Sequence, residues 1–214
     1  MAGLPVVLPI PQETATASYN WTDIASGTGI VDFQAIATEN DEGIAYRLTT
    51  HPYTSEPSHI AWDTPMGTTN FTIDSSPFNL PRTMKGTLTV AFLQAVWTRL
   101  HDGARTYNTI EFFHYDGTTE TSLAPSQTGP ETGGDQDQEV YYDNVVMDFD
   151  IPLTNFKKGD ILRMKIAQWG SDNDAGYAVG LDPLSRDISW FGKTVEAANH
   201  PTWFKVAVPF RIDL

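Results

Sequence analysis

Apolar and polar residues alternate along many separate stretches of this chain, which is the period-two pattern of β-strands with one buried face. In the stretch 85–97, for example, Leu88, Val90 and Phe92 fall on one face. No stretch shows the 3.6-residue period of a helix. We expect roughly eight to ten strands, over residues 29–38, 44–53, 70–74, 85–97, 106–115, 120–124, 140–151, 161–168, 177–181 and 203–212.

Turn signals separate these stretches, and two of them are strong. Asp116-Gly117 is typical of a hairpin, and Lys157-Lys158-Gly159-Asp160 is typical of a tight turn. So many short strands predict an all-β fold, an antiparallel jelly-roll-type β-sandwich with an extended N-terminal arm. An immunoglobulin-type sandwich is less natural at this length, and its cysteine pair is missing. Residues 125–138 contain no apolar residue and are expected to form a long, mobile surface loop.

The first twenty residues differ from the rest of the chain. Pro5, Pro9 and Pro11 block a helix and favour an extended backbone. We therefore expect an arm over residues 1–20, followed by a single jelly-roll domain over residues 21–214. Apolar side chains on an extended arm gain free energy only when they pack on another surface. The expected intersubunit contacts are the apolar residues between the prolines: Leu4, Val6, Val7, Leu8 and Ile10.

Charge and composition exclude several classes of binding partner and site. The formal net charge is −14, and the 13 Lys and Arg residues are scattered without a basic stripe, so we expect no nucleic-acid partner. No apolar run approaches the ~18 residues of a membrane-spanning helix, and we expect no membrane association. The absence of cysteine excludes disulfides and thiolate metal sites.

Sequence motifs for catalysis are missing. The chain has no G-x-S-x-G nucleophile elbow, no H-E-x-x-H zinc motif and no phosphate-binding loop. Asp148 and Asp150 have a spacing that two glycosidase carboxylates require, but alternating aspartates are the ordinary pattern of an exposed strand face. We therefore predict that the protein is not an enzyme.

Calcium is the one cofactor that the sequence makes a candidate. In Asp172-Asn173-Asp174-Ala175-Gly176, oxygen ligands stand two apart before a glycine, as they do in calcium loops. The glutamate that closes an EF-hand loop is absent, because Pro183 occupies its position. Asp172 and Asp174 are the candidate ligands. The alternative is a solvated turn, in which Asp and Asn are favoured for backbone reasons.

Six tryptophans leave two interpretations open. Aromatic side chains contribute large buried areas to cores and subunit interfaces, and exposed ones serve as platforms for sugar rings. A carbohydrate- or receptor-binding module is therefore an alternative function. The residues are Trp21, Trp62, Trp97, Trp169, Trp190 and Trp203.

Four segments carry a resemblance to a known group of proteins. They are Phe71–Phe78, Pro81–Val90, the turn Phe156–Arg163 and the closing Val208–Leu214. These segments resemble virion structural proteins of tailed viruses from marine or saline habitats, archaeal viruses included. The turn also resembles the K-G-D turn of tumour necrosis factor-like jelly rolls.

The resemblance implies a jelly roll located in the virion. Such proteins decorate or cement capsids, or form turrets and fibres, and they offer no catalytic residues to map onto this chain. The implied partners are further copies of the chain, in a trimer or larger ring, and the major capsid protein or other virion proteins. A single jelly-roll major capsid protein is the alternative within the same group.

Overall fold

Strands are the only regular elements in the part of the chain that the computed structural model describes. That part comprises residues 17–18, 28–40, 43–51, 59–63, 66–98, 103–136, 138–172, 175–190 and 192–211. The strands are β1 (Ala17–Ser18), β2 (Thr28–Asn40), β3 (Gly43–Thr49), β4 (His59–Asp63), β5 (Gly67–Ser75), β6 (Arg82–Thr98), β7 (Arg105–Tyr115), β8 (Glu120–Ser122), β9 (Gln127–Thr128), β10 (Thr132–Gly133), β11 (Val140–Phe156), β12 (Ile161–Gly170), β13 (Ala175–Gly180), β14 (Ile188–Trp190), β15 (Lys193–Val195) and β16 (Phe204–Arg211). In these ranges no helix is long and apolar enough to span a membrane.

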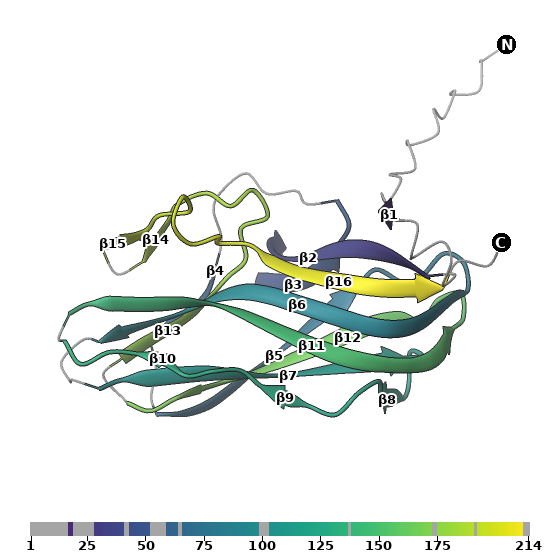
Figure 1. Ribbon diagram of the computed structural model, residues 1–214, viewed down its shortest axis with the longest axis horizontal. Coiled ribbons are helices and arrows are strands. Elements are labelled where there is room, and N and C mark those ends of the chain that lie inside the picture. Colours follow the sequence, from purple (N-terminus) through teal and green to yellow (C-terminus); the bar gives the residue numbers. More distant parts are fainter. Residues whose placement is uncertain are drawn as a thin grey trace, which may run out of the picture.

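One sheet curls over to form two layers. Its strand order is β10-β7-β12-β5-β3-β2-β16-β6-β13-β4, with β11 added on β6 and with β8 and β9 added on β7. Strands β2, β16, β6 and β11 lie in one layer, and β5, β12 and β7 lie in the other (Figure 1). The predicted all-β, jelly-roll-type sandwich is confirmed. Of the pairings between described strands, only that of β3 with β5 is parallel.

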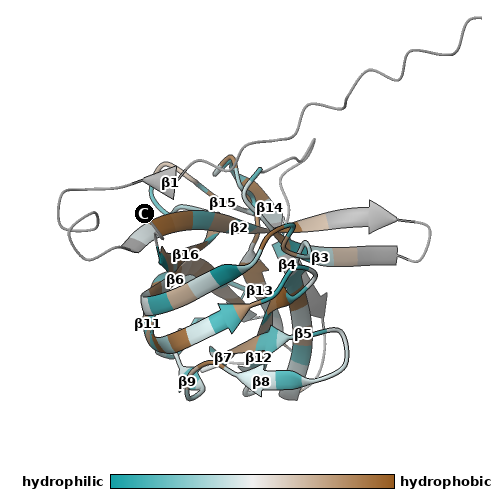
Figure 2. Cartoon of the chain, turned by 90° about the vertical axis from the view of Figure 1, so that its right-hand side faces the viewer, coloured by the Kyte–Doolittle hydropathy of each residue, from teal (hydrophilic) through white to brown (hydrophobic). Residues whose placement is uncertain are grey.

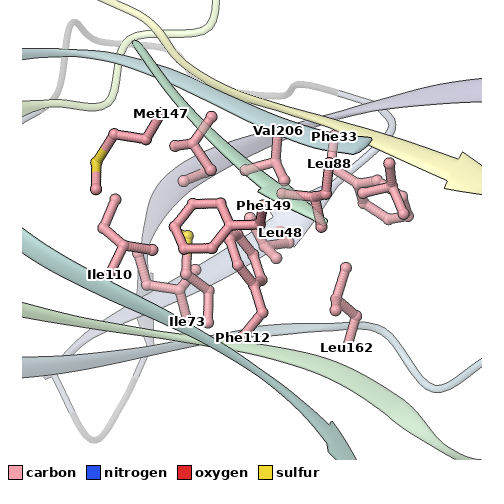
Figure 3. Packing of buried hydrophobic residues seen from close by; sticks show 14 of the residues in the cluster. Phe33, Leu48, Ile73, Leu88, Ile110, Phe112, Met147, Phe149, Leu162 and Val206 are labelled. Atoms are coloured by element: carbon pink, nitrogen blue, oxygen red, sulfur yellow. The ribbon is translucent and has the colours of Figure 1, made fainter. Parts of the chain in front are cut away.

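The core lies between the two layers and follows the predicted alternation. Along β11, Met147, Phe149 and Ile151 are buried while the aspartates between them are exposed. Figure 2 shows this alternation as successive hydrophobic and hydrophilic bands along the strands. Phe149 meets Phe112 of the opposite layer edge to face, with ring centroids 5.1 Å apart (Figure 3).

The second half of β6 departs from simple alternation, because residues 92–96 are all buried. Gln94 is wholly enclosed and is bonded on three sides. Its Nε2 donates to the carbonyl of Pro130 and to the hydroxyl of Thr132, and its Oε1 accepts from Nδ2 of Asn108. Hydrogen bonds of this kind offset the cost of burying an amide.

The same bonds correct the prediction of a long mobile loop over residues 125–138. Within that segment β9 and β10 both pair with β7. The side chain of Gln127 also donates to the backbone carbonyl of Asp148 in the opposite layer. The segment thus bridges the two layers with polar groups. Its lack of apolar residues hid this role, because hydrophobic pattern does not report cross-layer hydrogen bonds.

Two further elements escaped the sequence pattern. β4 pairs with β13, and β14 forms a two-stranded hairpin with β15. These three strands are three to five residues long, too short for a period to be recognised.

Of the predicted arm, only β1 lies within the described residues, where it pairs with β2 at Ile30 and Val31. The division into an arm (1–20) and one domain (21–214) stays a prediction.

Candidate functional site

A cleft of about 340 Å³ opens where the curled sheet passes from one layer to the other. At this seam β3 and β5 run parallel and pair over two residues, with Arg47 opposite Asp74 and Leu48 opposite Ser75. We call the opening the seam cleft. It is lined by residues of both strands and of the segment that follows β5: Tyr46, Arg47, Asp74, Ser75, Ser76 and Pro77.

Asp74 sits between two arginines on adjacent strands, since it lies opposite Arg47 of β3 and Arg163 of β12. Arg163 donates hydrogen bonds to both carboxylate oxygens of Asp74, from Nε to Oδ1 at 2.7 Å and from Nη2 to Oδ2 at 2.6 Å. This two-bond arrangement matches the fork geometry of guanidinium and carboxylate. The Arg163 guanidinium also lies 3.9 Å from the ring centre of Tyr115.

Glu120 completes the network from β8. It accepts from Nη1 of Arg163 at 2.7 Å and from Nζ of Lys165 at 2.5 Å. These two cations, Lys165 first, hold the pKa of Glu120 below its usual value. The bonds to Asp74 and then to Glu120 outweigh burial and raise the pKa of Arg163 above its usual value. The two bonds from Arg163 hold the carboxylate of Asp74, which is the member of this network that lines the seam cleft.

Arg47 is left as a surplus cation at the seam cleft. Its side chain is exposed, and no acidic residue in the described ranges pairs with it, because Arg163 already holds both oxygens of Asp74. Two other lining residues, Tyr46 and Ser76, carry hydroxyls that have no hydrogen-bond partner among the described residues. Burial raises the pKa of Tyr46, so its hydroxyl is a protonated donor at neutral pH. The cleft thus presents one free guanidinium and two free hydroxyls.

The structure leaves the calcium prediction untested. Asp174 lies outside the described residues, and only its neighbour Asp172 is placed. The backbone N–H of Asp172 donates to the hydroxyl of Tyr177, which in turn donates to the Asp172 carbonyl. Within the described ranges no three His, Cys, Asp or Glu side chains gather into a metal-binding group. Calcium binding at Asp172 and Asp174 stays a prediction.

The predicted contact residues of the arm also lie outside the described residues. They are Leu4, Val6, Val7, Leu8 and Ile10. Their role in assembly stays a prediction.

Asp148 and Asp150 have structural partners. They accept hydrogen bonds from the hydroxyls of Thr89 and Thr87 on the neighbouring strand β6, at 2.6 and 3.4 Å. Successive cross-strand pairs of this kind stabilise an exposed sheet face.

Three of the six tryptophans have side chains in the described part of the structure. Trp97, Trp169 and Trp203 are partly buried, and Trp169 stacks on Tyr107 with ring centroids 4.8 Å apart. The side chains of the other three lie outside the described part. The described tryptophans are therefore not all buried in the core, and carbohydrate binding stays a prediction.

Comparison with known proteins finds only distant similarity, and only among solved structures. No protein family matches the sequence, and no curated protein matches it. Among solved structures, an aminopeptidase from a marine sediment archaeon (Thaumarchaeota) is 8% identical, with a TM-score of 0.46 and a match that covers 85% of this chain and 37% of that one. A CocE/NonD family hydrolase from Staphylococcus aureus is 8% identical, with a TM-score of 0.45 and coverage of 83% and 36%.

A viral capsid protein is also among the similar structures. A VP2 protein of infectious bursal disease virus, solved as T=1 particles, is 14% identical, with a TM-score of 0.26 and coverage of 86% and 49%. The chain spans about a third of the length of the two hydrolases and about half that of VP2. At these identities and scores the matches carry no argument about what this chain does.

Hydrolases are nevertheless among the solved structures that match this fold, so the prediction that the protein is not an enzyme does not stand. That prediction rested on missing sequence motifs. Active sites are assembled from side chains that are distant in sequence and adjacent in space, so the absence of a short motif does not exclude catalysis. The prediction was wrong as an exclusion.

The residues of the seam cleft were not singled out from the sequence. Arg47 and Asp74 stand on strands that the pattern predicts, but their adjacency depends on which strands pair. Parallel pairing of β3 with β5 has no sequence signal, because it follows from the way the whole sheet curls.

Proposed function

We propose that this chain is a structural component of a virion, which decorates or cements the capsid or forms a turret. Its proposed partners are further copies of the chain and the major capsid protein. Support comes from the resemblance in the segments Phe71–Phe78 and Phe156–Arg163, and from a two-layer fold made of strands. A rigid sandwich of this kind is suited to hold a fixed surface toward neighbouring subunits.

The observation that carries the proposal is the free edge of β11, a strand that exposes one apolar side chain on each side of its two exposed aspartates, Asp148 and Asp150. Within the described residues β11 pairs with β6 alone, so its other edge has no strand partner. On this strand Val146 is 64% exposed and Leu153 is 54% exposed. Single exposed apolar residues are common, but a long unpaired edge is a ready site for contact with another chain. We call Val146, Leu153 and the free edge of β11 the β11 patch.

The proposed occupant of the β11 patch is the apolar arm of another subunit, residues 4–10. Residues 1–12 contain no charged side chain, whereas the whole chain carries a net charge of −14. Two such acidic surfaces repel each other at short range, and an uncharged arm approaches without that cost. Burying a few aliphatic side chains supplies several kcal/mol, at about 25 cal/mol per Å².

Light scattering of the purified protein tests this proposal. The full chain is expected to assemble into at least a trimer, and deletion of residues 1–12 should reduce the mass toward that of one chain. Val146→Asp should have the same effect, because it places a charge in the β11 patch. Thr121→Asp, at an exposed position of β8 in the other layer, is the matched control and should leave the mass unchanged. Circular dichroism confirms that each variant is folded.

A full-length protein that is monomeric, or a mass unaffected by both the deletion and Val146→Asp, would contradict the proposed assembly. Co-sedimentation with capsid shells tests the second partner. Loss of sedimentation on either change is expected, and retention by both variants would contradict a contact through these residues.

A further inference from the structure

We infer that the seam cleft is a binding site for a sugar that carries a carboxylate, with Arg47 as the residue that holds the acid group. This inference is independent of the proposed role in the virion. It rests on the cleft of about 340 Å³ between β3 and β5, and on the polar residues that line it. The volume falls within the range of small-molecule sites, roughly 300–1,000 Å³.

The charges at the cleft favour a ligand with a single negative charge. Asp74 faces two arginines, and Arg163 satisfies both of its oxygens at 2.6 and 2.7 Å. Arg163 and Lys165 are further neutralised by Glu120. Among the described residues at the cleft, one positive charge, that of Arg47, therefore has no acidic partner, although the protein as a whole is strongly acidic. A carboxylate matches one guanidinium in both charge and shape, whereas a phosphate dianion calls for more than one cation.

The other lining groups favour hydroxyls on the ligand. The free hydroxyls of Tyr46 and Ser76 can each donate and accept a hydrogen bond. Ser75 is already engaged, since its hydroxyl donates to the Ser76 carbonyl and accepts from the N–H of Leu162. The Ser75 hydroxyl is therefore occupied, whereas no described residue bonds the hydroxyls of Tyr46 and Ser76.

An acidic sugar fits this lining better than the C-terminal carboxylate of a peptide. A peptide terminus brings an apolar or bulky side chain, which needs an apolar pocket beside the acid group. Among the lining residues only Pro77 and the ring of Tyr46 offer apolar surface. A sugar ring presents hydroxyls at its rim and C–H groups on its face, and both have partners here.

Titration of the full-length protein with sodium D-glucuronate, followed by NMR, tests this inference. Saturable binding with a dissociation constant on the order of 1 mM is expected, because few atoms make contact. Arg47→Gln should weaken binding roughly tenfold or more, since it removes the charge and the two-bond fork. Lys85→Gln removes one exposed positive charge outside the cleft and should leave the affinity unchanged.

Two further probes separate the parts of the inference. D-Glucose lacks the carboxylate and should bind at least roughly tenfold more weakly than glucuronate. Acetate lacks the hydroxyls and should also bind more weakly, and Ser76→Ala should weaken glucuronate but not acetate. The inference is overturned if glucuronate does not bind, if Arg47→Gln binds it as the unaltered protein does, or if acetate binds as tightly as glucuronate. Because Arg47 and Ser76 are exposed, these substitutions leave the fold intact.

Discussion

Truncation of Phe149 to alanine tests the two-layer packing on which every surface in this protein depends. Phe149 is fully buried on β11, and its ring meets Phe112 of the opposite layer at 5.1 Å and an interplanar angle of 80°. Removing a buried phenylalanine costs about 3–5 kcal/mol, from lost transfer free energy and from the cavity left behind. The stability of a domain is about 5–15 kcal/mol, so we expect loss of a large fraction of it.

The edge-to-face contact itself can be isolated by a double-mutant cycle with Phe112→Ala. A coupling of about 0.5–1.5 kcal/mol is expected for an aromatic pair of this geometry. Urea unfolding followed by tryptophan fluorescence measures each free energy of unfolding. Asn144→Ala, at an exposed position of the same strand, is the matched control and should change stability by less than ~0.5 kcal/mol.

A loss of stability from Phe149→Ala no larger than that from Asn144→Ala would contradict this packing. So would a cycle that shows no coupling between Phe149 and Phe112. Either result would mean that β11 and β7 do not face each other across a common core.

Three other predictions concern acid, calcium and a close backbone contact. Burial alone would raise the pKa of Asp160, but the N–H of Lys157 and the ring of His114 bond its carboxylate and lower that pKa. Its contribution to stability is therefore present above the unfolded-state pKa and lost as pH falls through the lower, folded-state value. Asp160→Asn should flatten the acid limb of a stability–pH curve below the unfolded-state pKa, and an unchanged limb would count against the pair. If Asp172 ligates calcium, saturating calcium should raise Tm by roughly 5–10 °C after chelator treatment, and Asp172→Asn should remove the rise. Gly180→Ala places a Cβ 2.5 Å from the Thr202 carbonyl oxygen and should cost on the order of 1–3 kcal/mol in urea unfolding; a neutral result would mean that the loop before β16 does not cross β13 so closely.

The alternation of apolar residues was enough to predict most strands and their buried faces. On β12, Leu162, Met164 and Ile166 are buried as their spacing requires, and β16 buries every second residue from Phe204. Parity is a local property: successive side chains on a strand point to opposite faces whatever the strand pairs with. For the same reason the sequence determined the fold class, an all-β sandwich, before any pairing was known.

The alternation of apolar residues did not predict the buried polar residues. Gln94 and Asn108 stand on strands predicted by their apolar neighbours, yet both are fully buried and bonded to each other. A polar residue at an inward position interrupts the apolar alternation. Its burial cannot be predicted unless its hydrogen-bond partner is known. Here the partners come from β7 and from the segment around Pro130, which the sequence marked only as a loop.

The sequence by itself therefore determined the all-β class, most strands with their inward faces, the acidic composition and the absence of thiol chemistry. Only the tertiary structure decided which strands are neighbours, and with them the seam cleft. Arg47, Asp74 and Arg163 belong to three strands that are far apart in the chain, and they form one row because β3, β5 and β12 pair in that order. Strand order is set by the packing of the whole sheet around its core, so no local stretch of sequence contains it.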